Sequence, residues 1–390
     1  MSGGTETGRA CVGSIDLAPS TAVPAGGVSA STVIDPPLRS QRIAALDGWR
    51  AISIALVIAG HLISYRAGYS GRVVMLSGYF ATLGVKVFFV ISGFLITRLA
   101  LTEQANTGAF SAGGFYLRRV FRILPAFFAY LLGVTVLAAF GAIDQGPVWR
   151  AAAFLCNLPG AQCGWYAGHT WSLAYEEQFY LLFPLIFLWA SSARRTLFIT
   201  IHVLLVCTPL VSFFVPGDWR ALREFILHFS SLSAGVLAAC FYPALRAAGD
   251  RGYTAAALLV VALSVLLVGA NAANLPYAVR VAVEAVFLPP AIAWLILKTT
   301  WSDGVVTRAL ENRWVRYIGA ISFSLYLWQE LFTGSPALRV ASVWFNPLVL
   351  LPVAALSYHY IELPMIRLGK RCSARIQTAS RKRSDQARTA

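Results

Sequence analysis

Long apolar runs separated by short polar segments dominate the chain from about residue 45 onward. About ten of these runs are long enough to cross the hydrocarbon core of a bilayer as a helix, which takes roughly 20 residues. The predicted spans cover residues 46–65, 80–100, 122–141, 173–191, 196–215, 224–245, 253–270, 278–299, 314–333 and 345–366. A further apolar segment, residues 149–158, is too short to span and is expected to lie at the membrane interface. The pattern therefore predicts an all-α polytopic membrane protein.

Polar segments flank this apolar region at both ends. Residues 1–44 are rich in Gly, Ser, Thr, Ala and Pro and contain no apolar run, which indicates a disordered cytoplasmic arm. They also lack the features of a cleaved signal peptide, so we expect the first span to target the chain. Residues 369–390 form a basic tail, interpreted as a cytoplasmic retention signal that touches anionic lipid. We favour this over a nucleic-acid-binding tail. Residues 45–368 remain as the membrane domain.

The composition excludes a disordered chain, a coiled coil and an ordinary cytosolic enzyme. Of the 390 residues, 57% are hydrophobic and only 13% are charged, whereas soluble domains carry about a quarter charged residues. The ten spans place 23 of the 32 Lys and Arg residues on the side of both termini and 7 on the other side. Basic residues collect on the cytoplasmic side of membrane proteins. We therefore expect both termini in the cytoplasm and a multi-pass protein of the cell's inner, cytoplasmic membrane, with no nucleic-acid partner despite the net charge of +15.

The same topology suggests a disulfide. Cys156 and Cys163 share one loop on the outer side, where a disulfide can persist. The sequence contains no CxxC pair and no cluster of His and Cys residues. We therefore predict no metal site.

Two ionisable residues lie in the first predicted span. Arg50 and His61 are eleven residues apart, close to three helical turns, so they share one helix face with an axial separation of about 16 Å. Arg50 alone could be an interfacial anchor, and His61 alone could be a histidine bound to a neighbouring backbone group. Both on one face of one span favour a functional role, because ionisable residues inside a membrane are energetically unfavourable.

The fourth predicted span carries two glutamates near its outer end. Ser172, Glu176 and Tyr180 follow an i, i+4, i+8 spacing and share a face, while Glu177 points about 100° away. Either carboxylate overlaps His61 in estimated depth, so a His–Glu pair that supports His61 as a base is possible. The alternative is a structural polar clamp between helices.

Further charged residues occur in or next to the second and third spans. Lys86 lies in the second span, where its side chain could snorkel outward, and the nearby Ser92 and Gly93 are small residues suited to close helix contact. Arg119 and Arg122 stand at the cytoplasmic boundary of the third span. They either follow the positive-inside pattern or bind the phosphates of a cytosolic ligand, since the guanidinium fork suits phosphate.

Six blocks of the sequence together resemble the integral-membrane acyltransferases usually called the acyltransferase 3 family. They are LDGWRAISIALVIAGH, VFFVISGFLIT, FYLRRVFRILP, TWSLAYEEQFYLLFP, ISFSLYLWQ and SYHYIELP. The blocks span roughly residues 46–368 in family order, and the first and fourth are the most specific. The resemblance implies a ten-helix domain that takes an acyl group, usually acetyl, from a coenzyme A thioester on the cytoplasmic side. It implies transfer to a hydroxyl, commonly on a cell-surface or exported carbohydrate such as lipopolysaccharide or another polysaccharide.

The resemblance also assigns roles to individual residues. The family's essential residues and motifs map onto Arg50 and His61, onto Arg119 and Arg122, onto Trp171, Ser172 and Glu176 or Glu177, and onto Glu362. This chain departs from the family at Gln329, where many relatives have His, so a second titrating group is absent there. Some relatives also carry a soluble esterase-like domain, which we do not expect because the chain ends about two dozen residues after the last span.

In the implied mechanism Arg50 and the third-span arginines, with Lys86, Trp171 and Ser172, hold the substrates. Acetyl-CoA or another acyl-CoA is a co-substrate, and no cofactor is bound permanently. His61 acts as a general base on the acceptor hydroxyl or is itself transiently acylated. One alternative keeps the enzyme but gives it a cytoplasmic, macrolide-like acceptor. Another is a non-enzymatic carrier of a glycan or acyl donor.

Overall fold

The computed structural model describes residues 43–66, 71–158, 160–189, 220–247, 253–272, 277–302, 304–333 and 346–389. All of them belong to one compact unit, Pro37–Ala390. The first half contains α1 (Ala44–Arg66), α2 (Gly71–Thr107), α3 (Ala112–Ala139), α4 (Trp149–Ala152), α5 (Gly164–Gly168), α6 (Trp171–Trp189), α8 (Arg220–Cys240) and α9 (Tyr242–Ala247). The second half contains α10 (Tyr253–Ala272), α11 (Tyr277–Val281), η2 (Ala282–Phe287), α12 (Leu288–Trp301), α13 (Val305–Leu310), α14 (Arg313–Ala320), α15 (Ser322–Trp328), α16 (Glu330–Thr333), α17 (Asn346–Ser357), η3 (Tyr358–Glu362) and α18 (Leu363–Thr389).

The described residues form helices and no strands, as the apolar pattern predicts. Within the described ranges, five helical stretches are long and apolar enough to cross a membrane: Ala44–Ser64, Val73–Thr107, Ala112–Ala139, Val279–Trp301 and Leu348–Ile376. Two shorter apolar stretches, Leu227–Cys240 and Thr254–Leu267, accompany them. The protein is therefore an all-α, multi-pass membrane protein. The predicted span at 196–215 lies outside the described residues.

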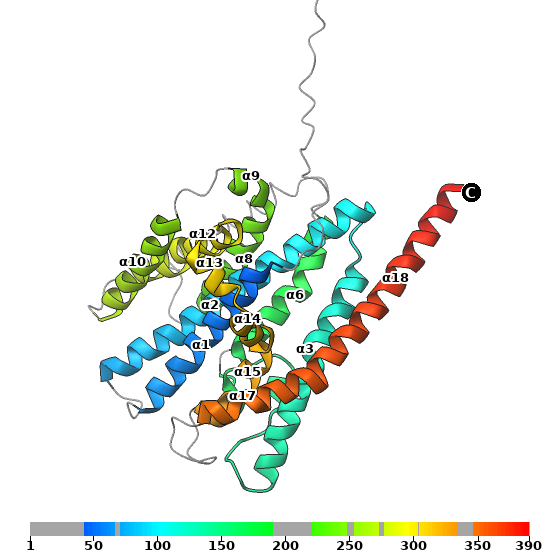
Figure 1. Ribbon diagram of the computed structural model, residues 1–390. Coiled ribbons are helices and arrows are strands. Elements are labelled where there is room, and N and C mark those ends of the chain that lie inside the picture. The colour runs from blue at the N-terminus through cyan, green and yellow to red at the C-terminus, as the bar shows by residue number, and fades with distance from the viewer. Residues whose placement is uncertain are drawn as a thin grey trace, which may run out of the picture. The chain divides into compact units, whose positions relative to one another are not determined.

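Helix α2 packs against both α1 and α8 (Figure 1). The tightest approach joins α2 and α8 at two glycines. A Cβ atom on Gly93 would lie 2.0 Å from the carbonyl oxygen of Leu232, and one on Gly235 would lie 2.1 Å from the carbonyl oxygen of Val90. Small residues allow such close backbone contact between membrane helices, which confirms the expectation for Gly93.

The prediction of one continuous helix over residues 314–333, the ninth span, is wrong. Residues 313–333 form three short helices, α14, α15 and α16, with breaks at Ile321 and Gln329. The segment 149–158 likewise contains only the four-residue helix α4. Apolar length alone predicts neither break, because a continuous apolar run is compatible with both a straight and an interrupted helix.

Two stretches of π-helix interrupt the helical segments near the C-terminal half. Each is followed by proline: η2 precedes Pro289 and Pro290, and η3 precedes Pro364. Proline lacks the N–H that would close the preceding α-turn, and its ring clashes with the carbonyl of that turn. A local switch to wider π-turns accommodates this. The two π-segments carry Glu284 and Glu362, which both take part in polar contacts described below.

The C-terminal helix α18 continues from η3 and packs along α3 (Figure 1). Its contact with α3 includes Ser373, whose hydroxyl accepts a hydrogen bond from Arg118 Nη1 at 2.6 Å. Arg118 also pairs with Glu103 of α2 through Nη2 at 2.9 Å. The contact thus ties α2, α3 and α18 together at one end of the helical bundle.

The glycine contact gives a stability prediction. We expect Gly93→Ala to lower the free energy of unfolding in detergent by about 1–3 kcal/mol, the usual effect of overpacking. Gly78→Ala in the same helix is the matched control, because a Cβ there meets nothing within 4 Å. Thermal or denaturant unfolding of both variants checks this. Equal stability of the two variants would contradict the close contact of α2 with α8.

Candidate active site

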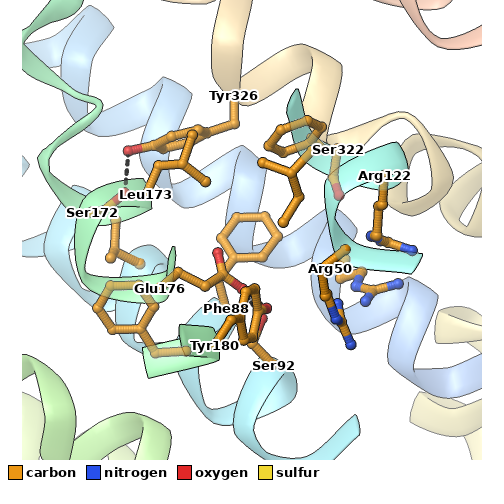
Figure 2. Close-up of a pocket in the computed structure, with 15 residues that line it drawn as sticks. Arg50, Phe88, Ser92, Arg122, Ser172, Leu173, Glu176, Tyr180, Ser322 and Tyr326 are labelled. Carbon is orange, nitrogen blue, oxygen red and sulfur yellow. Dashed lines mark hydrogen bonds between the residues drawn. The ribbon is translucent and has the colours of Figure 1, made fainter. Parts of the chain in front are cut away.

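Side chains of five helices converge on a small pocket that we call the arginine pocket. Arg50 of α1 and Arg119 and Arg122 of α3 line it, together with side chains of α2, α6 and α15. Figure 2 shows Arg50 and Arg122 on one side of the pocket and Ser172 and Tyr326 on the other. Three guanidinium groups in one pocket favour an anionic ligand, because each offers a planar fork of N–H donors.

Glu176 lies in the same pocket and is held by two hydroxyl groups. Ser92 Oγ and Tyr180 OH both donate hydrogen bonds to Glu176 Oε1. Arg119 stacks over the Tyr180 ring, 4.7 Å from its centre. The predicted stripe of Ser172, Glu176 and Tyr180 along one face of the fourth span is confirmed, since all three line this pocket. Glu176 thus offsets part of the positive charge that the arginines bring in.

A second cavity, the histidine pocket, contains His61 of α1. It is also lined by His169, Trp171, Gln329 and Glu330. His61 Nδ1 lies 3.0 Å from Glu330 Oε1, and only 5% of the Glu330 side chain is exposed. A buried carboxylate beside one ring nitrogen fixes the orientation of the imidazole and leaves the other nitrogen, Nε2, for chemistry.

The predicted carboxylate partner of His61 is therefore not the one that the structure shows. Neither Glu176 nor Glu177 is its partner in this structure. The face of α6 that carries Glu176 turns toward the arginine pocket, and Glu177 lines none of the cavities described here. The depth estimated along straight helices placed His61, Glu176 and Glu177 at a similar depth in the membrane. The broken helix α15–α16 instead brings Glu330 to His61.

The arginine and histidine pockets adjoin at Val85 and Tyr326, which line both. Tyr326 OH donates to the carbonyl oxygen of His169 at 2.6 Å and lies 2.6 Å from Ser172 Oγ. Arg50 and His61, which lie on one face of α1, thus line two neighbouring cavities rather than one.

A third cavity, the tryptophan groove, is next to the histidine pocket, and the two share Thr82 and Trp171. Its lining comprises Thr82, Cys156, Asn157, Trp171, Tyr175, Leu227, His228, Arg280, Val281 and Glu284. The lining of this space thus contains both aromatic and polar side chains.

Lys86 does not snorkel outward as expected. Its side chain is 1% exposed, and Nζ lies 3.1 Å from Glu284 Oε1 of η2. A long cationic chain deep in an apolar bundle requires a counter-charge, and the π-segment supplies it. Lys86 is also absent from the residues that line the arginine pocket, where the other predicted donor-binding cations lie.

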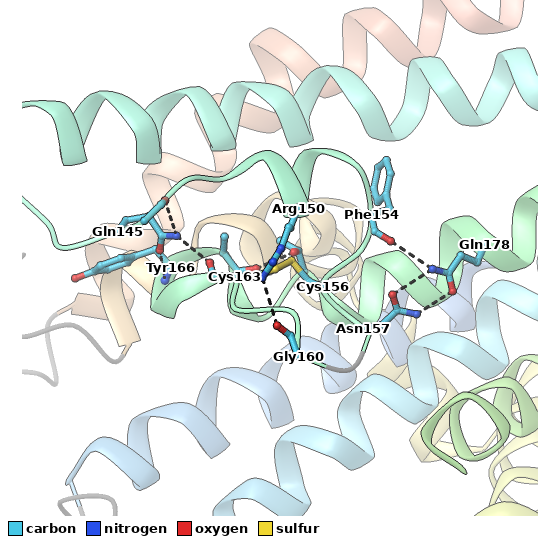
Figure 3. The surroundings of a disulfide bond; sticks show 12 residues. Gln145, Arg150, Phe154, Cys156, Asn157, Gly160, Cys163, Tyr166 and Gln178 are labelled. Carbon is cyan, nitrogen blue, oxygen red and sulfur yellow. Dashed lines mark hydrogen bonds between the residues drawn. A yellow bond between two sulfur atoms is a disulfide. The ribbon is translucent and has the colours of Figure 1, made fainter. Parts of the chain in front are cut away.

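The predicted disulfide between Cys156 and Cys163 is confirmed (Figure 3). It closes a loop that borders two cavities, because Cys156 lines the tryptophan groove and Gly164 lines the histidine pocket. Gln145 fixes the loop further. Its Nε2 donates to the carbonyl oxygen of Cys163 at 2.8 Å, and its Oε1 accepts from the amide of Tyr166 at 3.0 Å.

Glu362, mapped by the family resemblance, lies outside these three cavities. It is 2% exposed and accepts a hydrogen bond from Ser324 Oγ at 3.0 Å. The contact joins η3 to α15, the helix that carries Tyr326 and leads into Gln329 and Glu330. Glu362 thus holds α15 in place. Within the described part of the chain, no group of three or more His, Cys, Asp or Glu residues is arranged to hold a metal ion.

Sequence reasoning missed Glu330 and His169. Glu330 lies inside the apolar stretch 314–333, and an acidic residue in a predicted span is a functional candidate by default. That signal was present. His169 precedes the fourth span in a polar stretch, and nothing in the pattern distinguishes it from a loop histidine.

Comparisons with known proteins agree with the resemblance. A family model described as an acyltransferase domain, acyltransferase 3, matches residues 43–359. No solved structure shows a significant match.

Curated bacterial proteins are similar to this chain at 26% identity. The peptidoglycan O-acetyltransferase OatA of Listeria monocytogenes matches over 84% of this chain and 56% of its own length. A Bacillus subtilis protein, YrhL, with the provisional name peptidoglycan O-acetyltransferase, matches over 85% and 56%. A Staphylococcus aureus protein provisionally named as an O-acetyltransferase matches over 84% and 58%. The chain thus spans a little over half the length of these relatives.

The Lys86–Glu284 pair gives an asymmetric prediction. Glu284→Gln leaves a fully buried cation and should lower the free energy of unfolding by about 3–5 kcal/mol. Lys86→Met leaves Glu284, which is 24% exposed, and should be milder. The double variant should resemble Lys86→Met. Unfolding of the three variants in detergent checks the order. Glu284→Gln as stable as Lys86→Met would contradict the pairing.

Proposed function

Because the chain belongs to the acyltransferase 3 family, we propose that it is a membrane O-acyltransferase. It moves an acyl group, in our proposal acetyl, from a coenzyme A thioester to a hydroxyl of a cell-surface or exported carbohydrate. The observation that carries this proposal is the pair of adjoining cavities, one lined by three arginines and the next by a His–Glu pair. One suits the anionic end of the donor, and the other suits proton transfer.

The donor binds first in the arginine pocket. Arg50, Arg119 and Arg122 hold the phosphates of coenzyme A through charge-assisted hydrogen bonds. Glu176, fixed by Ser92 and Tyr180, limits the excess positive charge and orients the neighbouring arginines. The flexible pantetheine arm then extends past Val85 and Tyr326, the residues common to both cavities.

The acyl group reaches His61 over the Arg50–His61 rise of about 16 Å along α1. With Nδ1 directed to Glu330, Nε2 of His61 accepts the proton of the acceptor hydroxyl as that oxygen attacks the acyl carbon. The thiolate of coenzyme A then leaves and is protonated by His61, which passes on the proton of the acceptor hydroxyl. The products are an ester and free coenzyme A.

The acceptor enters by the tryptophan groove, which shares Trp171 with the histidine pocket. A sugar ring combines an apolar C–H face with hydroxyl groups around its edge. Trp171 and Tyr175 offer aromatic faces, and Asn157, Arg280 and Glu284 offer polar groups. The names of two relatives, which refer to peptidoglycan, support a carbohydrate acceptor.

The proposed topology has ten spans with both termini in the cytoplasm, in the cytoplasmic membrane. It rests on the excess of basic residues on that side, 23 against 7. The arginine pocket then opens toward the cytoplasm, where acyl-CoA is available, and the disulfide loop lies outside. We retain the arm at 1–44, the membrane domain at 45–368 and the basic tail at 369–390 as parts of this proposal.

The proposed function predicts distinct kinetic effects for His61 and Arg50. Purified protein given acetyl-CoA with labelled acetyl and soluble peptidoglycan fragments should release coenzyme A and label the carbohydrate. His61→Ala should lower kcat by about a hundredfold or more, because it removes the base. Arg50→Lys should mainly raise the donor KM, since a point charge cannot form the planar fork. Arg308→Ala, an exposed arginine on α13, is the control for loss of positive charge.

Two outcomes would oppose the proposal. If the wild-type protein leaves the thioester intact, it is not a coenzyme A-dependent acyltransferase, and a carrier role fits better. If His61→Ala turns over normally, the histidine pocket is not the reaction centre.

The topology predicts opposite locations for two reporter sites. Fusions at Ala390 should report the cytoplasm, and fusions within residues 143–160 should report the outer side. Alkaline phosphatase and fluorescent-protein reporters measure this in intact cells. The same side for both sites would rule out the ten-span arrangement.

A further inference from the structure

Gln329 is a buried amide with nothing to bind. The residue is 0% exposed, and among the described residues neither Nε2 nor Oε1 has a hydrogen-bond partner. A buried polar group without a partner is unfavourable by about 1–3 kcal/mol, and folded proteins satisfy nearly all such groups. The side chain lines the histidine pocket. A ligand in that pocket is therefore the natural partner of this amide.

The backbone of Gln329 is held in a fixed place by hydrogen bonds of its N–H and carbonyl groups. Gln329 lies between α15 and α16, and its amide N–H donates to the carbonyl oxygen of Leu325 at 3.0 Å. Its own carbonyl oxygen accepts from the amides of Phe332 and Thr333 at 2.8 and 2.9 Å, and from Thr333 Oγ1 at 3.0 Å. The helix break is thus stabilised by local hydrogen bonds. A donor on such a rigid support loses little entropy when it binds.

Gln329 belongs to the wall of the cavity that contains the proposed base. Glu330, the next residue, holds His61 at 3.0 Å, and all three side chains line the histidine pocket. Two successive residues therefore line the histidine pocket with different roles. Glu330 orients His61, and Gln329 has side-chain N–H donors with no partner among the described residues.

We propose that Gln329 is a catalytic residue that stabilises the oxyanion of the acyl transfer. This rests on the proposed function above. As the acceptor oxygen attacks the acyl carbon, the carbon–oxygen bond of the ester forms, and the π electrons of the carbonyl move to its oxygen. Gln329 Nε2 donates a hydrogen bond to that oxygen. When the carbonyl re-forms, the carbon–sulfur bond breaks and the thiolate leaves with the proton held by His61.

A side-chain amide is a competent donor for this role. Removal of one such donor in other acyl-transfer enzymes lowers kcat by about 10²–10³. The effect falls on kcat rather than KM, because the hydrogen bond strengthens only as negative charge develops. An amide that merely held the acceptor hydroxyl would instead change the acceptor KM.

The test compares Gln329→Leu and Gln329→Glu with the wild-type protein, using labelled acetyl-CoA and soluble peptidoglycan fragments. Both variants remove the N–H donors, and Gln329→Glu keeps the shape. We expect kcat to fall by about 10²–10³ in each, with both KM values within about twofold. Gln104→Leu is the matched control. This half-buried glutamine of α2 lines none of the three cavities, and its Oε1 also lacks a partner.

Stability separates this role from a structural one. Because the amide has no hydrogen bond to lose, Gln329→Leu should unfold at the same temperature as the wild-type protein or higher. Gln329→His, which restores an N–H donor, should recover part of the lost kcat.

Three results would overturn the proposal. These are an unchanged kcat in Gln329→Leu, a raised acceptor KM at normal kcat, or a loss of activity that follows a loss of stability. If the wild-type protein itself transfers no acyl group, the proposed function fails and this proposal with it. If the wild-type protein is active and Gln329→Leu equals it, only the role of Gln329 is rejected.

Discussion

The contact between His61 and Glu330 joins the first helix of the membrane domain to the break between α15 and α16. In an apolar bundle a titratable group needs a polar partner, because water is not available to solvate it. This requirement links α1 to α16 through His61, and η3 to α15 through Glu362 and Ser324. It also links α2 to η2 through Lys86 and Glu284. The helices are thus joined at a few polar points within an otherwise apolar interior, and the cavities lie beside these points.

The sequence predicted the helical class, the first and third spans, the disulfide and most of the arginine pocket. The helices and the disulfide follow from local signals: apolar length, helical spacing and two cysteines in one loop. The grouping of Arg50 with Arg119 and Arg122 followed instead from the family resemblance. It did not predict which carboxylate meets His61. That contact depends on the break after Trp328, which no apolar pattern encodes. Depth estimated along ideal straight helices allowed Glu176 or Glu177 to lie beside His61, whereas the interrupted segment places Glu330 there. The spacing rule was reliable within one helix and unreliable between helices.

The π-segments show how proline contributes to function at a distance from any turn. Pro289 and Pro290 follow η2, and Pro364 follows η3. Each segment widens the helix at a point where an acidic side chain enters the bundle. Glu284 thereby reaches Lys86, and Glu362 reaches Ser324. A sequence search for charged residues finds the acids, but the wider turns that orient them become visible only when the prolines are considered together with them.

The disulfide loop has a consequence for how the protein matures. Cys156 forms part of one cavity wall, and Gly164 and Trp165, directly after Cys163, form part of another. Without the disulfide, these walls would be held only by noncovalent contacts such as those of Gln145. The disulfide therefore fixes the walls of both cavities covalently. Covalent closure of these walls then depends on the redox state of the compartment that the loop enters.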